Sequence, residues 1–129
     1  MTDISHYSEV RAQNESFPLY KRAYHICKET KRVQEFNLVC QDQKMSDQEK
    51  CVKLGQMMNE SQYNFNNFYN NSCPELEEIT QLARDSGALG SKQSGAGWGG
   101  VCVSMVPKDK VNEFLAKIKT YYLKERPED

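Results

Sequence analysis

The chain concentrates its glycines in one short segment whose composition suits the binding of an anion. Six of its seven glycines lie between Gly87 and Gly100, and four of them surround the chain's single tryptophan, Trp98. Glycine permits positive φ angles and lets another group approach the backbone without meeting a Cβ atom. Backbone N–H groups exposed in this way can donate hydrogen bonds to phosphate oxygens. The segment therefore predicts either a phosphate-binding loop or a tight hairpin with packing glycines.

The spacing Gly95-x-Gly97-x-x-Gly100 also matches the fingerprint of dinucleotide-binding proteins, but the flanking sequence excludes that class. The fingerprint needs a strand before the motif and a helix that opens at its last glycine. Here the glycines precede alternating β-branched residues over 101–106, which predict a strand. The Gly-x-x-x-x-Gly-Lys phosphate loop and the His-Arg-Asp and Asp-Phe-Gly motifs of protein kinases do not occur in the sequence.

The composition excludes several other classes of function. At 129 residues the chain is long enough for one domain with a single core. Its formal net charge of −1 gives no electrostatic argument for nucleic acid or for a membrane surface as a partner. We expect neither a membrane-spanning segment nor a signal peptide, because the sequence contains no long apolar run and its first residues are polar.

The cysteines and His25 are expected to be structural. The five cysteines are odd in number and contain no Cys-x-x-Cys pair, which predicts reduced thiols in a cytoplasmic protein and neither a disulfide framework nor a zinc site. Each cysteine is expected to be a small buried hydrophobic residue. His25 is expected to be a hydrogen-bonded residue on a helix face, without a catalytic role. The cysteines are Cys27, Cys40, Cys51, Cys73 and Cys102.

We expect one domain over residues 17–124, with a polar lead-in over residues 1–16 and a polar tail over residues 125–129. Hydrophobic periodicity, a capping box at Ser46-x-x-Glu49 and a proline at position 74 indicate the helices, and β-branched runs indicate the strands. The predicted helices cover residues 20–39, 46–68, 74–86 and 108–124, and the predicted strands cover residues 88–93 and 101–106.

The expected buried faces follow from the apolar spacing, and Ser72 is expected to cap the third helix. The first helix is expected to bury Tyr20, Ala23, Ile26, Cys27, Val33, Phe36, Val39 and Cys40. The second is expected to bury Cys51, Leu54, Met58, Ser61, Phe65 and Phe68. The third is expected to bury Leu76, Ile79, Leu82 and Ala83, and the last Val111, Phe114, Leu115, Ile118 and Tyr122.

The order of elements predicts an α+β fold that is rich in helix, with a β-hairpin around the glycine-rich loop. Two strands alone barely form a stable sheet. The ferredoxin-like split β-α-β-β-α-β fold would supply more strands, but its last strand should follow residue 124, and residues 124–129 do not have the sequence of a strand. Either that strand lies outside the given sequence or the protein lacks it, and without it the sheet edge beside residues 101–106 is unpaired. We therefore expect dimerisation or strand exchange through this edge.

Four ordered stretches carry a resemblance to a known family. Residues 90–107 closely resemble the third conserved motif of the GHMP small-molecule kinases, and the form Gly-Ala-Gly-Trp-Gly-Gly is most similar to eukaryotic galactokinases and N-acetylgalactosamine kinases. Three further stretches are similar to the same kinases in the same order, so that the resemblance covers nearly all of residues 18–123. They are Arg22-Ala23-Tyr24-His25 with Glu29 and Arg32-Val33, then residues 54–62, then residues 72–76.

The resemblance implies the C-terminal domain of a sugar kinase. Such a kinase transfers the γ-phosphoryl group of ATP, with Mg²⁺, to the anomeric hydroxyl of galactose or N-acetylgalactosamine. In the family the glycine loop lies near the triphosphate, and Trp98 is expected to pack on the core and fix this loop rather than to stack on adenine. Mapped onto this sequence, the loop residues are Ser94, Gly95, Ala96, Gly97, Trp98, Gly99 and Gly100.

The resemblance also implies that half of the active site lies elsewhere. The family's sugar signature, its Gly-Leu-Ser-Ser-Ser-type phosphate loop and its catalytic aspartate do not occur in this sequence. No catalytic or metal-binding residue is therefore assigned, and this chain alone is expected to show no turnover and no tight ATP binding. Its expected partners are the N-terminal kinase domain of the same protein, the sugar and ATP. Two alternatives stay open: a galactokinase-like sensor of sugar and ATP, and a non-catalytic interaction module.

Overall fold

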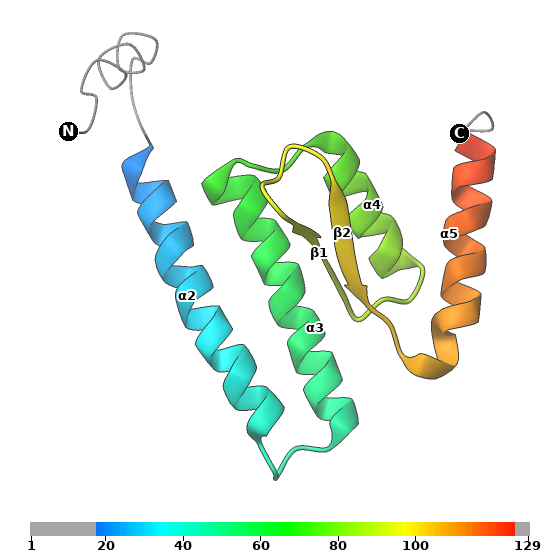
Figure 1. Ribbon diagram of the computed structural model, residues 1–129, viewed down its shortest axis with the longest axis horizontal. Coiled ribbons are helices and arrows are strands. Elements are labelled where there is room, and N and C mark those ends of the chain that lie inside the picture. The colour runs from blue at the N-terminus through cyan, green and yellow to red at the C-terminus, as the bar shows by residue number, and fades with distance from the viewer. Residues whose placement is uncertain (1–17, 126–129) are drawn as a thin grey trace, which may run out of the picture.

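The computed structural model describes residues 18–125, which form four α-helices and one β-hairpin (Figure 1). The predicted order α-α-α-β-β-α and the helix-rich α+β class are confirmed. The predicted lead-in and the tail from residue 126 on lie outside the described residues. No helix in the described range is long and apolar enough to cross a membrane. The elements are α2 (Leu19–Gln41), α3 (Asp47–Asn64), the π-helical turn η1 (Phe65–Tyr69), α4 (Pro74–Asp85), β1 (Gly90–Ser94), β2 (Val101–Met105), the 3₁₀ turn η2 (Lys108–Lys110) and α5 (Val111–Glu125).

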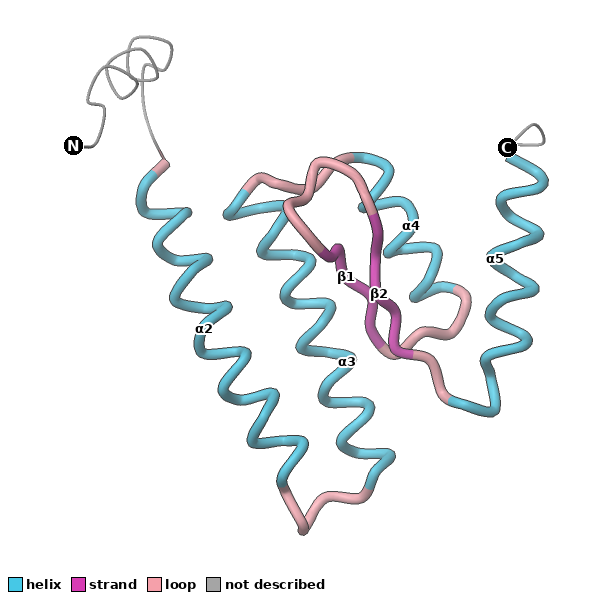
Figure 2. The backbone as a smooth tube through the Cα atoms, in the orientation of Figure 1, coloured by secondary structure: helices cyan, strands magenta, loops and turns pink. Residues whose placement is uncertain are grey.

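Helices α2 and α3 run side by side and are joined by a short turn (Figure 2). The predicted capping box is confirmed: the Ser46 hydroxyl accepts from the Glu49 N–H, and the Glu49 carboxylate accepts from the Ser46 N–H at 2.9 Å. The hydrogen bonds from Ser46 lower the pKa of Glu49. Pairing both groups at the cap fixes where α3 begins. The apolar core lies between these two helices and is formed by Val39, Leu54 and Met57, with Phe36, Met45 and Met105 packed against it.

Helix α2 presents a different face to α3 from the one that the apolar spacing predicts. Tyr20, Ile26 and Val33 are exposed, with 76, 53 and 66% of their surface accessible, so their predicted burial is wrong. The buried side chains on α2 are those of His25 and Val39. The face of α2 that is turned toward α3 instead contains Glu29 and Arg32, which lie three residues apart and form an ion pair. A search for apolar periodicity overlooks a stripe of this kind because its centre is charged.

The two strands form an antiparallel hairpin in which Gly90 pairs with Met105 and Ser94 pairs with Val101. Strand β1 packs against both α3 and α4, and β2 packs against α4. Directly paired residues share a face of the sheet. Ser91, fully buried, and Ser104 share one face, with their hydroxyls 2.9 Å apart, whereas the other face carries the exposed Val101 and Val103. This second face is covered only in part: Lys92 and Met105 contact α3 and the core, whereas Val101 and Val103 are left exposed.

Helix α4 begins at the predicted proline, but its cap differs from the prediction. The residue at the cap position is Cys73, and no side-chain hydrogen bond caps the helix. The Ser72 hydroxyl instead donates to the Glu77 carboxylate at 2.5 Å. Gly87 follows the helix with φ of 111°, as the predicted left-handed stop requires.

The five thiols are free, but their predicted burial is wrong. Cys27, Cys40 and Cys51 are exposed, and Cys73 and Cys102 are half-buried. Cys27 lies on the opposite side of α2 from Glu29, which meets Ser61 of α3, and its thiol is therefore turned to solvent.

Helix α5 lies beside α4 at the edge of the domain (Figure 1). The phenol of Tyr121 donates to the Glu78 carboxylate of α4 at 2.8 Å. Val111 and Leu115 are 37 and 56% exposed, so their predicted burial is wrong. The apolar face of α5 is thus only partly covered by the elements from residue 18 to 125.

Candidate glycine-loop site

The glycine loop, residues 95–100, connects β1 to β2 and has a backbone that glycine alone adopts without strain. Gly95, Gly97 and Gly100 have φ angles of 90, 90 and 94°, and Gly99 has 143°. Trp98 also lies in the left-handed region, with φ of 55°. Five positive φ angles within six residues fold the chain into a compact loop between strands. The backbone conformation of this loop therefore explains why the segment is rich in glycine.

Asn71 lies directly beneath this loop, in the connection between η1 and α4. Its carbonyl oxygen accepts from the Trp98 N–H at 2.7 Å, and its side-chain Nδ2 donates to the Ala96 carbonyl at 3.0 Å. A Cβ atom on Gly97 would lie 2.0 Å from the Asn71 carbonyl oxygen. The loop therefore rests on Asn71 at a distance that excludes every side chain at position 97.

A line of buried amide groups continues from Asn71 into the domain. Gln93 of β1 donates through Nε2 to the Asn71 carbonyl at 3.3 Å, and its own N–H donates to Gln62 Oε1 at 2.7 Å. Gln62 of α3 donates in turn to the Glu77 carboxylate at 2.6 Å. Gln62, Asn71 and Gln93 are each at most 3% exposed. These hydrogen bonds join the loop to α3, to β1 and to the first turn of α4.

The sequence analysis did not identify Gln62, Asn71 or Gln93 as site residues. The available signal was the pair Asn70-Asn71 just before a helix start, because asparagine accepts a left-handed backbone and bonds to nearby peptide groups. Asn70 has φ of 57°, which turns the chain out of η1 and places Asn71 under the loop.

Some backbone donor groups of the loop have no acceptor within the described residues. The Trp98 N–H is occupied by Asn71, whereas among the described residues the N–H groups of Ala96, Gly97 and Gly99 donate to no protein acceptor. Ser94 is exposed at the end of β1. Successive N–H groups in positive-φ backbone form a concave donor surface that suits a phosphate group.

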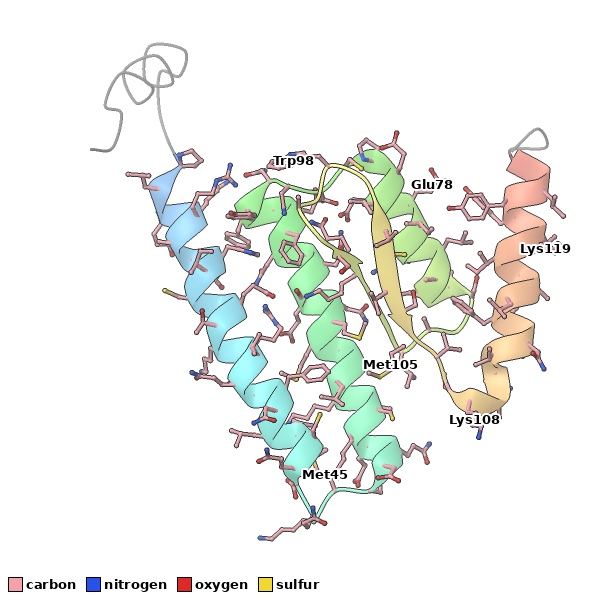
Figure 3. The ribbon with its side chains drawn as sticks, viewed as in Figure 1. Met45, Glu78, Trp98, Met105, Lys108 and Lys119 are labelled. Carbon is pink, nitrogen blue, oxygen red and sulfur yellow. The ribbon has the colours of Figure 1, made fainter. Side chains whose placement is uncertain are left out.

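The Trp98 side chain does not pack on the core, so that prediction is wrong. Its side chain is 69% exposed, and Figure 3 shows it at the outer end of the loop. The contact that holds this residue is the one made by its main chain to Asn71.

A second polar cluster lies between α2, α3 and β1. Lys92 donates to the Ser61 hydroxyl at 2.8 Å, and Ser61 donates to Glu29 at 2.8 Å. The Glu29 carboxylate also pairs with Arg32, and Lys92 lies over the ring of Phe65, 5.0 Å from its centre. Burial, and secondly the charge of Arg32, lower the pKa of Lys92. The cluster fixes β1 against both long helices one residue before Gln93.

His25 belongs to an adjoining aromatic cluster. Its ring stacks on that of Tyr69 at 4.6 Å and contacts that of Phe65 at 5.0 Å. Burial, and secondly the charge of Arg32, lower the pKa of His25. These contacts give it a packing role between α2 and η1.

The carbonyl groups at the end of η1 are bound by a single arginine. Arg22 of α2 donates to the carbonyls of Phe68, at 2.8 Å, and Tyr69, and to Asn70 Oδ1 at 2.9 Å. Unpaired carbonyls at a helix end are commonly bound by a cationic side chain in this way. The segment that carries Asn71 is thus fixed from the α2 side as well.

No group of three or more His, Cys, Asp or Glu side chains within residues 18–125 is placed to hold a metal ion.

Comparison with known proteins places the chain in a family of kinase C-terminal domains. The family model described as GHMP kinases C terminal matches residues 48–124. The galactokinase of Dictyostelium discoideum is 40% identical over 128 residues, which cover 89% of this chain and 26% of that protein. The galactokinase of Saccharomyces cerevisiae is 38% identical over 105 residues, covering 76% of this chain and 20% of that protein. The chain thus spans about a quarter of the length of these curated relatives.

The fold also occurs among solved structures. The crystal structure of Lactococcus lactis galactokinase complexed with galactose superposes with a TM-score of 0.70 and 23% sequence identity. The superposition covers 94% of this chain and 30% of that one.

Proposed function

The chain belongs to the family of GHMP kinase C-terminal domains, and we propose that it forms one wall of the ATP site of a galactokinase-like enzyme. The glycine loop carries this proposal, because the N–H groups of Ala96, Gly97 and Gly99 have no acceptor among the described residues while the loop itself is fixed to Asn71. In phosphoryl transfer the protein contributes chiefly positioning and charge stabilisation. Donors that are already in place need no rearrangement when charge develops on the phosphoryl oxygens.

The proposed phosphate-binding residues are Ser94, Gly95, Ala96, Gly97, Trp98, Gly99 and Gly100. The backbone N–H groups and the Ser94 hydroxyl would bind the β- and γ-phosphate oxygens of ATP. The anomeric hydroxyl oxygen of the sugar forms a bond to the γ-phosphorus, the bond from that phosphorus to the bridging oxygen breaks, and the hydroxyl proton leaves to a base. That base would belong to the N-terminal part of the kinase, which also recognises the sugar.

Galactose is the proposed sugar, because the relatives described above carry the name galactokinase. N-acetylgalactosamine is the alternative acceptor. The free thiols support a location in the cytosol. Residues 17–124 are proposed as the C-terminal domain that packs on the N-terminal kinase domain, with ATP between the two.

We also propose that this chain by itself associates through its hairpin. Val101 and Val103 are 65 and 53% exposed, and within the described residues the hairpin has no third strand. An uncovered, β-branched strand invites pairing with another copy.

A chimera tests the proposed function directly. The matching segment of the Dictyostelium discoideum galactokinase is replaced by this chain, and the product is assayed for ATP-dependent phosphorylation of galactose and of N-acetylgalactosamine. We expect a folded chimera that phosphorylates galactose, and no turnover by the 129-residue chain alone. A folded chimera that binds ATP and galactose without phosphorylating the sugar would support the sensor alternative. A folded chimera that binds neither would overturn the proposal.

A further inference from the structure

We propose that Asn71 is a positioning residue for the glycine loop, which holds residues 95–100 in one conformation from beneath. Two parts of Asn71 act on two neighbouring peptide groups. Its main-chain carbonyl binds the N–H of Trp98 at 2.7 Å, and its side-chain amide binds the carbonyl of Ala96 at 3.0 Å. Gly97 lies between these two bonds and touches the Asn71 carbonyl. The effect of Asn71 on catalysis rests on the proposed function, whereas its effect on loop conformation does not.

The side-chain bond requires an amide rather than a carboxylate. Asn71 Nδ2 faces the Ala96 carbonyl, and Gln93 Nε2 faces the Asn71 carbonyl, so each amide presents its donor to an acceptor. The two amide oxygens, Asn71 Oδ1 and Gln93 Oε1, are buried without a protein donor among the described residues. Reversing either amide would place two acceptor oxygens against each other, which is unfavourable in a buried site. The surroundings therefore select the amide orientation that holds the loop.

Asn71 can act as a support because it is itself fixed. Its N–H donates to the carbonyl of Phe65 at 3.2 Å, across the π-helical turn. Asn70, in its left-handed conformation, bonds to Arg22 of α2. Asn71 is thus tied directly to the start of η1 and, through Asn70, to α2, and 3% of its surface is accessible.

This support determines which donors a phosphate would meet. Asn71 accepts the Trp98 N–H, so that this donor is occupied, whereas the N–H groups of Ala96, Gly97 and Gly99 have no acceptor within residues 18–125. A loop of glycines without such a support would sample many backbone conformations. Because Asn71 restricts the loop beforehand, less backbone conformational entropy is lost when a phosphate binds. The donors are then already in place to stabilise the transition state.

The chain contains its own reporter for the test. Trp98 is the only tryptophan, so its time-resolved fluorescence anisotropy measures local motion of the loop in the 129-residue protein. In Asn71→Ala the amide donor is lost, and we expect a larger amplitude of fast Trp98 motion with an unchanged far-UV circular dichroism spectrum. Asn66→Asp, an exposed site on the same turn, is the matched control and should behave as the wild type. Wild-type Trp98 motion in a folded Asn71→Ala variant would overturn the proposal.

Asn71→Asp gives a second, pH-dependent test with nearly the same side-chain shape. Burial raises the pKa of the introduced carboxyl group, which favours its neutral form. Below that pKa the group is protonated and can donate to the Ala96 carbonyl; above it, the carboxylate repels the same oxygen. We expect wild-type Trp98 motion near pH 5 and increased motion near pH 8, because the raised pKa of the introduced carboxyl group should lie roughly between these two values.

The other groups that titrate around Asn71 must be controlled for in this test. The glycine loop contains no ionisable side chain. The wild type and Asn66→Asp, measured over the same pH range, report any contribution from the rest. The charged and titratable groups on the neighbouring elements are Arg22 and His25 of α2, Tyr69 of η1, Cys73, Glu77 of α4 and Lys92 of β1. Loop motion independent of pH in Asn71→Asp would contradict the proposal, as would failure of both Asn71 variants to fold.

The same variants in the chimera with the Dictyostelium discoideum galactokinase measure the effect on catalysis. We expect Asn71→Ala to lower kcat/KM for ATP by about 10- to 100-fold, as small misplacements of reacting groups do, with KM for galactose unchanged. The ratio of Asn71→Asp to wild type should rise as the pH falls, whereas the ratio for Asn71→Ala should not. An inactive wild-type chimera would count against the proposed function alone, because the fluorescence result does not depend on turnover. Unchanged kcat/KM in an active chimera would overturn the catalytic part of the inference.

Discussion

The main chains of Gly55 on α3 and Gly90 at the start of β1 are in direct contact. A Cβ atom on Gly90 would lie 2.2 Å from the Gly55 carbonyl oxygen, and one on Gly55 would lie 2.6 Å from the Leu89 carbonyl. Asn59, further along α3, binds the peptide groups on both sides of Gly90. Its Oδ1 accepts from the Ser91 N–H at 3.0 Å, and its Nδ2 donates to the Leu89 carbonyl at 3.1 Å. Helix α3 thus satisfies peptide groups that a neighbouring strand would otherwise bind.

Substitution of Gly90 by alanine should therefore separate α3 from β1. We expect Gly90→Ala to lower the free energy of unfolding by about 3 kcal/mol, because the added methyl group meets backbone that cannot move aside. Urea denaturation of the 129-residue protein measures this change. Gly87→Ala is the control: Gly87 has open space around it and only its φ of 111° to oppose a side chain, so the loss should be about 1–2 kcal/mol. Equal losses of stability for the two variants would contradict the backbone contact between Gly55 and Gly90.

The glycine loop provides a matched pair for the kinase assay. Gly95 and Gly97 both have φ of 90°, but a Cβ atom on Gly97 would collide with Asn71, whereas nothing lies within 4 Å of one on Gly95. In the chimera with the Dictyostelium discoideum galactokinase, Gly97→Ala should reduce kcat/KM for ATP at least about tenfold more than Gly95→Ala. Because the backbone strain is shared, the ratio isolates the contact with Asn71. A ratio near unity would show that this contact does not position the loop.

The polar cluster behind the loop predicts unequal effects of two glutamate substitutions. Glu29, 19% exposed, is shared by Arg32, Lys92 and the Ser61 hydroxyl. Glu29→Gln would take this carboxylate from both half-buried cations, with Arg32 retaining its longer pair with Glu60, and should lower the free energy of unfolding by about 2 kcal/mol. Glu35→Gln breaks an exposed pair with Lys31 and should change it by about 0.5 kcal/mol or less. Chemical denaturation of both variants distinguishes these outcomes, and similar small changes would contradict a structural role for the cluster.

His25 should make the stability of the fold depend on pH. Burial, and secondly the charge of Arg32, lower the pKa of His25 from 6.5, so the folded protein favours the neutral ring. The unfolded chain therefore binds a proton first as the pH falls. The free energy of unfolding should be maximal above pH 6.5 and should decrease as the pH drops through the lowered pKa of the folded state.

Substitution of His25 tests this dependence. His25→Phe retains a ring against Phe65 and Tyr69 but cannot be protonated. Its unfolding free energy should change less between neutral and mildly acidic pH than that of the wild type. His6→Phe, at the chain's other histidine, should retain the wild-type dependence. If His25→Phe shows the full wild-type dependence, other groups are responsible.

The partly covered face of the hairpin predicts a concentration-dependent assembly. Val103 is 53% exposed and pairs with Lys92 across the sheet. Light scattering of the 129-residue chain should show dimers or larger species at high concentration, and Val103→Lys should shift the protein toward the monomer. A strictly monomeric wild-type chain at the highest concentration attainable would refute this prediction.

Local sequence signals were sufficient for the elements and for the glycine loop. The capping box at Ser46, Pro74 at the first position of α4 and the positive φ of Gly87 each depend on a few adjacent residues, so the sequence alone predicts them. The positive φ angles in the loop follow likewise from its glycines. The assignment of the loop to phosphate binding stays a prediction.

Features that depend on contacts between distant residues could not be predicted in this way. The orientation of α2 is determined by Glu29 and Arg32 meeting Ser61 and Lys92, and no apolar periodicity records that arrangement. Asn71 is separated by 25 residues from Ala96, and its role depends on how η1 ends. Trp98 was expected to be packed because aromatic residues in loops often are, but its surroundings within the described residues leave it exposed.

The π-helical turn η1 makes the glycine-loop site sensitive to insertions and deletions within that turn. Each residue added to or removed from a helix rotates everything after it by about 100°. Deleting one residue within Phe65–Tyr69 would therefore turn Asn71 away from Gly97, even though every side chain of the loop was retained. The turn at residues 42–46 can absorb the same change at little cost, because it joins two helix ends at the protein surface. Insertions and deletions should accordingly be tolerated between α2 and α3 but should disrupt the support of the glycine loop when they fall between α3 and α4.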